Sequence, residues 1–453
     1  MKRVREWLSA RTPKQILVAS LILFWIYCWP GFVGWDTHEH IMQSRSGVYT
    51  DGHPPAIALM QRICELFITG PLLMMLFQSI TLMIGLYMLF RTRVSKRAAA
   101  IIASAIFLFP IVAGVTALIA KDCLMAGPAV IGFALLLDDR RKKQWLAVGF
   151  LFFASLMRWN AVAATFAPMV LLFQFHPGIR GVKRYAAALA VWIGLTGAAY
   201  AVNEALTVKR EYYWYWSHAY EDIAGTLQWI DNVDDPTLLQ WLDGVPLRIR
   251  ENLHASFRAI YDPAQYFQLV RPDQPNTIFL MPTTDQDRAA IKRAWERIVF
   301  GHPSAYLYYR YEAFRRLLGI DGKETFSRVY VWLSVIAAPE TIVQLQHDAS
   351  PSRIQVKLIE ASKWFSLTAI YLPIWYFALT FLLLPFALRR RLDVAILLSG
   401  IGYELQWYFL APSPDMRYSQ WMVLCALVGA ALVITTWRGS QPDAGLPANQ
   451  DAK

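Results

Sequence analysis

Long apolar runs separated by short polar segments recur along the chain, and the longest extend for about 18 residues or more. A helix needs about 20 such residues to cross the roughly 30 Å hydrocarbon core of a membrane. The runs lack the alternation of apolar and polar positions that marks the strands of a membrane barrel. The pattern therefore predicts an all-α polytopic membrane protein with about ten spans, at 15–33, 70–90, 98–119, 123–137, 145–157, 160–175, 185–204, 365–387, 393–410 and 419–437.

The segment from residue 205 to 364 breaks this pattern, because it is rich in charged, aromatic and turn-forming residues. Its stretches DQDRAAIKRAWERIVF and SAYLYYRYEAFRRLLG alternate basic and apolar positions at helical spacing, which predicts helices. We expect four parts: an N-terminal transmembrane module (1–204) whose first outer loop is 34–69, a mainly helical outer-face domain (205–364), a C-terminal transmembrane module (365–437) and a disordered cytoplasmic tail (438–453).

Basic clusters indicate which side of the membrane each loop faces, since Lys and Arg accumulate in cytoplasmic loops. Every second predicted span ends in such a cluster, near residues 91–97, 140–143, 180–184 and 389–391. The short loops between these clusters carry far fewer basic residues. The alternation predicts cytoplasmic termini, with the first loop and the large domain on the opposite side.

Composition agrees with a membrane protein. Of the 453 residues, 56% are hydrophobic and 17% are charged, against about a quarter charged in soluble domains. The formal net charge of +11 arises from clusters between apolar runs and not from one face of a soluble domain, which argues against nucleic acid as a partner. The four cysteines have neither the spacing of a disulfide framework nor that of a metal site.

Polar residues suited to chemistry gather where the predicted spans reach the outer face. They come from sequence-distant segments: Asp36, Glu39 and His53 from the first loop, then Lys121, Asp122, Arg158, Arg417 and Tyr418. The segment WSHAYEDIAG adds His218, Glu221 and Asp222 early in the large domain. Their common sidedness predicts one site at membrane level.

This arrangement resembles the GT-C superfamily of integral-membrane glycosyltransferases, of the bacterial family 39 type, which use polyprenyl-phosphate-linked sugars. The points of resemblance are Asp36 in the first outer loop, DGHPP at 51–55, KD at 121–122, RYSQW at 417–421 and the large outer domain. The resemblance implies transfer of a sugar to a lipid, glycan or protein acceptor on the outer face of the bacterial cytoplasmic membrane. The partners implied are the polyprenyl-phosphate-sugar donor, the acceptor and membrane lipids.

The resemblance supports Asp36 most firmly, as the carboxylate that takes the proton of the acceptor hydroxyl. Lys121, Arg158 and Arg417 are the cations that could stabilise the departing lipid phosphate. His53, Glu39, Asp122 and Tyr418 complete the expected substrate-binding set. Many superfamily members have two adjacent acids in the first loop, whereas Glu39 follows Asp36 by three residues here. Whether a divalent metal ion binds, with His38, His40 or His53 as ligands, is therefore left open.

Structural alternatives apply to several of these residues. Asp36 could cap a helix that begins at Thr37, and the prolines after His53 could shape the entry of a helix. Lys121 and Asp122 could form an interfacial ion pair, and Arg417 could extend toward lipid headgroups. At the level of function, the alternatives are a transporter or flippase of lipid-linked or small substrates and a non-enzymatic envelope assembly protein. Charges at the rim, with Glu404 as the exception inside a span, favour chemistry over transport.

Overall fold

The computed structural model describes residues 11–138, 140–174, 178–262, 266–270, 277–320, 351–388 and 390–438. Within these ranges every regular element is a helix, and strand pairing is limited to isolated bridges. The predicted all-α class is therefore confirmed. The predicted tail from residue 439 onward and the segment 321–350 lie outside the described residues.

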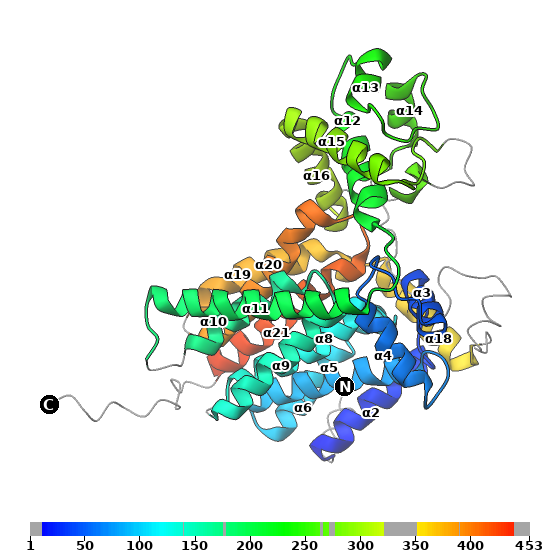
Figure 1. Cartoon of the computed structure of the whole chain (residues 1–453). Helices are drawn as coiled ribbons and strands as arrows, with labels where there is room; N and C mark the ends of the chain where they lie inside the picture. Colours follow the sequence, from blue (N-terminus) through cyan, green and yellow to red (C-terminus); the bar gives the residue numbers. More distant parts are fainter. Residues whose placement is uncertain are drawn as a thin grey trace.

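The helices form a bundle with one lobe standing on it (Figure 1). The bundle contains α2 (Pro13–Cys28), α3 (Trp35–Ser46), α4 (Pro55–Glu65), α5 (Leu72–Arg91), α6 (Lys96–Phe107), α7 (Pro110–Thr116), α8 (Lys121–Leu136), α9 (Arg141–Met157), α10 (Ala161–Gln174) and α11 (Val182–Leu206). After the lobe, the chain returns to it with α18 (Arg353–Ser366), α19 (Pro373–Ala387), α20 (Arg391–Leu410) and α21 (Gln420–Arg438). Each predicted span coincides with one or more of these helices.

Within the described residues, three stretches are long and apolar enough to cross a membrane: Leu72–Arg91, Val182–Leu206 and Met416–Thr435. A fourth is formed if α6 and α7, which are bent by 69° at their junction, count as one span. Pro110 begins α7 and lacks the N–H that would continue the helix, which explains the break inside the predicted span 98–119. The fold is thus compatible with a membrane protein, but ten individually spanning helices are not shown.

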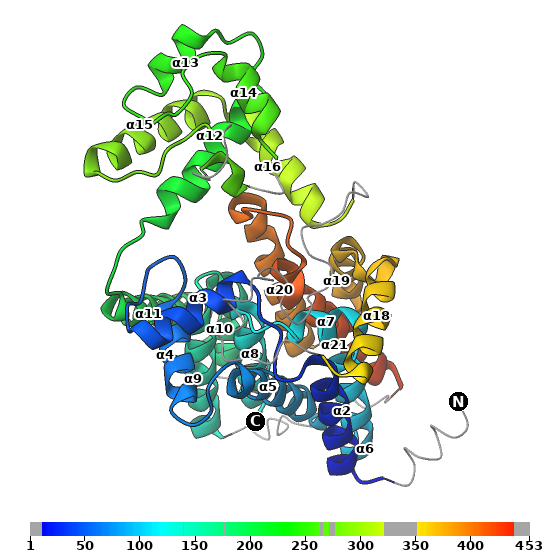
Figure 2. The ribbon, with the colours of Figure 1, turned by 90° about the vertical axis from the view of Figure 1, so that its right-hand side faces the viewer.

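The lobe is built from η1 (Tyr215–Ala219), α12 (Tyr220–Leu227), α13 (Asp235–Trp241), α14 (Leu253–Ile260), η2 (Tyr266–Leu269), α15 (Asp285–Gly301) and α16 (Pro303–Leu317). It has its own apolar core, separate from that of the bundle, and both views show it standing clear of the bundle helices (Figure 2). The C-terminal part of α16 leaves that core, because Phe314 and Leu317 pack into the bundle. Helix α18, which belongs to the segment predicted as the outer domain, packs on α2, with the Gln355 amide donating to the Trp29 carbonyl at 2.7 Å.

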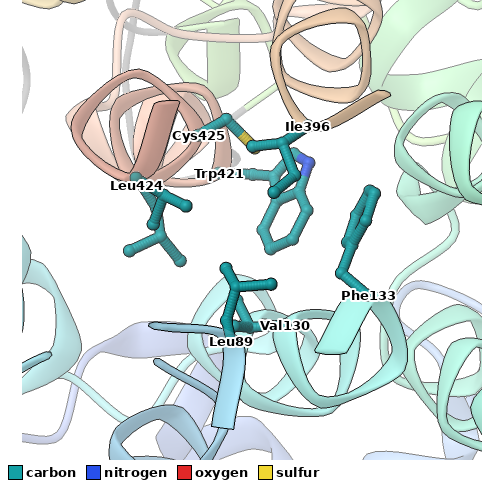
Figure 3. Close-up of a pocket in the computed structure, with 8 residues that line it drawn as sticks. Leu89, Val130, Phe133, Ile396, Trp421, Leu424 and Cys425 are labelled. Atoms are coloured by element: carbon teal, nitrogen blue, oxygen red, sulfur yellow. The ribbon is translucent and has the colours of Figure 1, made fainter. Parts of the chain in front are cut away.

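The bundle core has one small apolar gap between α5, α8, α20 and α21 (Figure 3). Its volume is about 10 Å³, and Leu89, Phe133, Ile396 and Trp421 are among its lining residues. A buried water needs several polar partners, whereas the one polar group of Trp421, its indole N–H, already donates to Ser399 at 3.0 Å. The gap is therefore a packing defect and not a binding site.

Candidate functional site

The first turn of α3 lies beside the first turn of α8 because the two segments that precede these helices pair. Phe32 and Leu118 form a parallel bridge, in which the Phe32 N–H donates to the Ala117 carbonyl and the Ile119 N–H donates to the Phe32 carbonyl, both at 3.0 Å. The Thr37 hydroxyl donates to the Ile119 carbonyl at 2.6 Å and accepts from the N–H of Gly34, the N-cap of α3. These bonds bring Asp36 next to Lys121, although 85 positions separate them.

Asp36 is the centre of a cluster of charges. Its Oδ2 atom lies 2.9 Å from the Lys121 ammonium and 2.7 Å from Nη1 of Arg417. His53 approaches the other oxygen at 3.8 Å and the Glu39 carboxylate at 3.5 Å. The side chains of Asp36, Lys121, Arg417 and His53 are each 12–13% exposed. The cluster therefore reaches solvent through a small opening and is neither sealed nor freely hydrated.

The loop that carries His53 is fixed at both ends. Thr50 bridges to Lys209, and the Asp51 carboxylate accepts from the Glu211 N–H at 2.6 Å, so the start of the lobe segment holds this loop. At the other end, Pro55 occupies the first turn of α4, as the sequence suggested. Nδ1 of His53 lies 2.8 Å from the Lys121 ammonium. Because an ammonium only donates, Nδ1 accepts and the imidazole proton lies on Nε2, facing the two carboxylates.

Arg417 is held in a short 3-10 turn, η4 (Met416–Ser419), that joins α20 to α21. The Asp415 carboxylate accepts from the Arg417 N–H at 3.1 Å and lies 2.9 Å from its Nε. The Arg417 guanidinium also lies 5.3 Å from the centre of the Tyr418 ring, which stacks on Trp407 at 4.5 Å. Arg417 is thus turned inward onto Asp36, which argues against the structural alternative that it extends toward lipid headgroups.

Asp122 and Arg158 form a separate pair behind the cluster. Their side chains are 1% and 2% exposed and lie 2.9 Å apart, with the Tyr403 hydroxyl 3.0 Å from the guanidinium and 3.1 Å from the carboxylate. Trp407 and Tyr418 lie over the Arg158 guanidinium at 5.2 and 5.5 Å. Arg158 is therefore more deeply buried than the Asp36 cluster, and Tyr418 contacts both its guanidinium and that of Arg417.

Two structural alternatives for the first loop and for α8 are also wrong. Helix α3 begins at Trp35 and not at Thr37, with Gly34 as its N-cap, so the Asp36 carboxylate faces cations and not helix N–H groups. Lys121 pairs with Asp36, and its sequence neighbour Asp122 pairs with Arg158. Adjacent residues at the start of a helix point about 100° apart, which explains why each finds a different partner.

The charges of this cluster are set by competition between burial and neighbouring ions. Burial acts to raise the pKa of Asp36, but Arg417 and then Lys121 hold that pKa well below its ordinary value. His53 likewise lowers the pKa of Glu39 against the effect of burial. Burial lowers the pKa of His40 to about 3, so its ring is neutral at physiological pH. Asp36 is therefore a stable carboxylate flanked by two cations.

No group of three or more His, Cys, Asp or Glu side chains is placed to hold a metal ion in the described part of the chain. Lys121 and Arg417 both contact Oδ2 of Asp36, the atom that a metal ion would need. A divalent cation there would be repelled by both. The residues present fit an anionic ligand better than a metal ion.

A second buried cluster joins the lobe to the loop that carries Arg417. The Arg310 guanidinium of α16 pairs with Asp222 of α12 and donates to the Ala411 carbonyl at 3.1 Å. His218 hydrogen-bonds the Leu410 carbonyl. The end of α20 is therefore held by two side chains of the lobe, six and seven residues before Arg417. Sequence reasoning passed over Arg310, although it ends the stretch GHPSAYLYYR as a basic residue on an aromatic helix face.

Glu221 shares this cluster and is fully buried, and neither carboxylate oxygen has a hydrogen-bond partner among the described residues. Burial raises the pKa of Glu221 well above the ordinary 4.5, although the positive charge of Arg310 acts to lower it. A carboxyl group whose pKa is higher in the folded than in the unfolded chain stabilises the fold below its ordinary pKa of 4.5. That stabilisation is lost as the pH rises through the pKa of the folded chain. The unfolding temperature of Glu221→Gln should therefore rise relative to that of the wild type as the pH is raised from 5 to 8.

Glu296→Gln on α15 is the matched control for this prediction, since that carboxylate is exposed and pairs with Lys292 at 3.8 Å. Its unfolding temperature should follow the wild type at every pH. The charged and titratable neighbours of Glu221 are Arg310, Asp222, Tyr309 and Tyr261, and none of them is changed. Parallel curves for Glu221→Gln and the wild type would contradict the assignment of a raised pKa.

No protein-family model, curated protein or solved structure matches the chain.

Proposed function

We propose that the chain is a membrane glycosyltransferase of GT-C type, which moves a sugar from a polyprenyl-phosphate-linked donor to a lipid, glycan or protein acceptor. The observation that carries the proposal is one carboxylate, Asp36, in contact with two cations, Lys121 and Arg417, at a small opening. A proton acceptor beside two phosphate-binding groups is what transfer from a phosphate leaving group requires.

In the proposed reaction, the acceptor oxygen forms a bond to the anomeric carbon while the bond from that carbon to the donor phosphate oxygen breaks. The electron pair of the broken bond leaves with the polyprenyl phosphate. The acceptor proton passes to Asp36, and Lys121 and Arg417 stabilise the charge that grows on the phosphate. Arg417 suits this role because its planar guanidinium can donate two parallel hydrogen bonds to phosphate oxygens.

The charges in the free protein suggest how the base is controlled. A carboxylate whose pKa is held low by two cations is a weak proton acceptor. A donor phosphate that binds Lys121 and Arg417 shares their charge, so the pKa of Asp36 rises toward its ordinary value. Asp36 then becomes a better base only when the donor is present, which limits proton transfer without substrate.

The surrounding residues support this centre. His53 directs its Nε2–H at the carboxylates of Asp36 and Glu39, and Gln43 donates to the other Glu39 oxygen at 2.9 Å, so the loop and α3 hold each other. Tyr418 lies between the Arg417 and Arg158 guanidiniums. We assign Asp122 and Arg158 to positioning Tyr418, because they are buried away from the opening.

The proposal includes the ten-span topology, with both termini in the cytoplasm of the bacterial inner membrane. The alternation of basic clusters supports it. The bridge between Thr50 and Lys209 ties the loop of His53 to the start of the lobe, which supports placing both on the same side of the membrane. The donor would then reach Asp36 from the outer leaflet.

The test uses purified protein and a labelled polyprenyl-phosphate sugar, with release of polyprenyl phosphate as the readout. Arg417→Ala should lower kcat/KM by roughly 10²–10³, equivalent to about 2–4 kcal/mol for loss of one preorganised donor. Arg417→Lys should recover part of the loss, because Lys restores the charge but not the planar fork. Rates are compared per folded protein, since both variants remove the contact between the Asp415 carboxylate and the Arg417 guanidinium.

Arg45→Ala provides the control. Arg45 is a cation on α3, the helix that carries Asp36, but it pairs with Glu65 at 2.9 Å and not with Asp36. It should stay within about twofold of the wild type, as expected for an exposed pair. A full rate for Arg417→Ala would remove Arg417 from the site. Absence of polyprenyl phosphate release by the wild type, with any acceptor class, would reject the glycosyltransferase proposal.

A transporter of lipid-linked or small substrates is the second candidate, favoured by ionisable groups inside the bundle. Asp122 and Arg158 are buried as a pair, and Glu404 of α20 is fully buried and accepts from Ser419 at 2.8 Å. Such groups mark substrate or ion pathways in transporters. Movement of labelled donor across liposomes without release of polyprenyl phosphate would favour this candidate.

A further inference from the structure

The far end of α8 borders a second polar pocket, remote from the Asp36 cluster. Helix α8 begins at Lys121 and runs for 16 residues, which is about 24 Å at 1.5 Å per residue. Beside its C-terminal end lies a pocket of about 550 Å³, formed where α5 and α8 end and where α6 and α9 begin. Figure 1 shows these four helices gathered in the part of the bundle away from the lobe.

The rim of this pocket is basic. Arg91, Lys96 and Lys143 line it, against a single carboxylate, Asp138. Asp138 is already occupied, because it lies 2.6 Å from the Lys143 ammonium and 2.9 Å from Nε of Arg140. Arg91 and Lys96 have no ion-pair partner within the described residues. Two cations at the rim therefore lack a counter-charge among the described residues.

The positions of these cations on their helices are unusual. Lys96 is the first residue of α6, Lys143 lies in the first turn of α9, and neither first turn contains an acidic residue. A helix N-terminus is already partly positive, so cations there are unfavourable without an anion nearby. Arg91 differs, because it lies in the last turn of α5, where a cation is favourable. Helix dipoles therefore do not account for Lys96 and Lys143.

The floor of the pocket is apolar. Met88 in the last turn of α5 lines this part of the pocket together with Ala134 and Leu135 in the last turn of α8. Arg91 is the last residue of Leu72–Arg91, one of the stretches long enough to cross a membrane, so the rim lies where a membrane surface would be. A basic rim above an apolar floor at that depth fits an amphiphile with an anionic phosphate, and basic pockets between transmembrane helices bind such headgroups.

We propose that this pocket binds an anionic glycerophospholipid, with its phosphate on Arg91 and Lys96 and an acyl chain along Met88 and Leu135. The apolar floor argues against free phosphate as the ligand. The two uncompensated cations argue against a zwitterionic lipid. The site is independent of the proposed sugar transfer, since it lies at the other end of α8 and shares no residue with the Asp36 cluster.

The test measures retention of lipid by the purified full-length chain, with phosphatidylglycerol as the probe and native mass spectrometry as the readout. Arg91→Gln/Lys96→Gln should lower the affinity for phosphatidylglycerol by roughly tenfold or more, since each cation near a membrane surface contributes severalfold. Arg91→Lys/Lys96→Arg should keep the affinity, because it conserves both charges. The control Arg141→Gln/Lys142→Gln removes two cations of α9 that do not line the pocket, and it should stay within about twofold.

Four outcomes would overturn the proposal. An equal loss of phosphatidylglycerol affinity in the control Arg141→Gln/Lys142→Gln would indicate a general effect of surface charge. Equal retention of phosphatidylcholine and phosphatidylglycerol by the wild type would remove the charge argument. Displacement of the lipid by millimolar glycerol phosphate would indicate a site for soluble phosphates. Unchanged retention in Arg91→Gln/Lys96→Gln would indicate that the rim binds no lipid.

Thermal unfolding of each variant shows whether the chain is folded. If the Gln pair does not fold, the charge-conserving pair and the comparison of the two lipids on the wild type still test the site. Loss of phosphatidylglycerol from a folded Arg91→Lys/Lys96→Arg chain would contradict binding through charge at these two positions.

Discussion

Asp36→Asn is expected to lower the rate of sugar transfer at least about 10²-fold, the usual effect of losing a general base. Asn has nearly the same shape as Asp, but it cannot take up the acceptor proton. It also withdraws the negative charge that Lys121 and Arg417 share at 2.9 and 2.7 Å. The measurement is the release of polyprenyl phosphate per folded protein, with the folded fraction taken from thermal unfolding of the same sample.

Glu39→Gln is the matched control, because Glu39 lies one helical turn further along α3 and faces His53 at 3.5 Å without touching either cation. Its rate should fall much less than that of Asp36→Asn. The two variants also differ in stability, because only Asp36→Asn removes the carboxylate that both Lys121 and Arg417 contact, and Arg417 then keeps Asp415 as a partner. A fully active Asp36→Asn protein together with an inactive Glu39→Gln protein would transfer the role of base to Glu39.

Hydropathy along the chain predicts where the helices of the bundle lie, because burial of apolar side chains dominates their formation. It does not predict where they stop, since ends depend on local chemistry. Pro110 divides the predicted span 98–119 into two helices bent by 69°, and α2 ends at Cys28, five residues earlier than predicted. Such breaks explain why fewer helices meet the length of a span than the apolar runs suggested.

Sidedness predicts which residues share a face, but it does not predict which side chains meet. Asp36, Lys121 and Arg417 were expected on one face from the parity of the spans, and they contact one another. Their pairing depends on the bridge between Phe32 and Leu118, two apolar residues that carry no polar signal in the sequence. In the sequence alone, Lys121 therefore looks like the partner of its neighbour Asp122.

Burial of charge is the property that sequence patterns describe least well. Arg158 follows α9 in a short polar turn, which suggests exposure, yet Tyr403 and Trp407 of α20 enclose it. These two aromatic residues are four positions apart and so share one face of α20, a signal present in the stretch GYELQWYF. Arg310 is the same kind of case, because its partner Asp222 lies 88 positions away.

Arg310→Met is expected to destabilise the chain by about 3–5 kcal/mol, the usual cost of leaving one member of a buried ion pair without its partner. The side chains of Arg310 and Asp222 are 1% and 5% exposed, so water cannot replace the lost partner. The Ala411 carbonyl loses a hydrogen bond as well, four residues before Asp415. Thermal or denaturant unfolding in detergent measures the loss, and activity should fall with it because the loop of Arg417 is less firmly held.

The double variant Arg310→Met/Asp222→Asn separates the cost of the stranded charge from the loss of packing. Asn keeps an acceptor for the Trp295 indole N–H, which donates to Asp222 at 2.8 Å, but it carries no charge, so more than half of the stability should return. In Arg310→Met alone, the raised pKa of Asp222 is no longer opposed by the Arg310 charge. The stability that this variant loses relative to the wild type should therefore become smaller as the pH falls and the Asp222 carboxylate is protonated. Arg315→Met, which breaks a partly exposed pair with Glu312 on the same helix, should cost no more than about 1 kcal/mol. If Arg310→Met costs no more than Arg315→Met, this ion pair does not fasten the lobe to α20, and Arg417 is positioned by its contacts with Asp415, Asp36 and Tyr418 without help from the lobe.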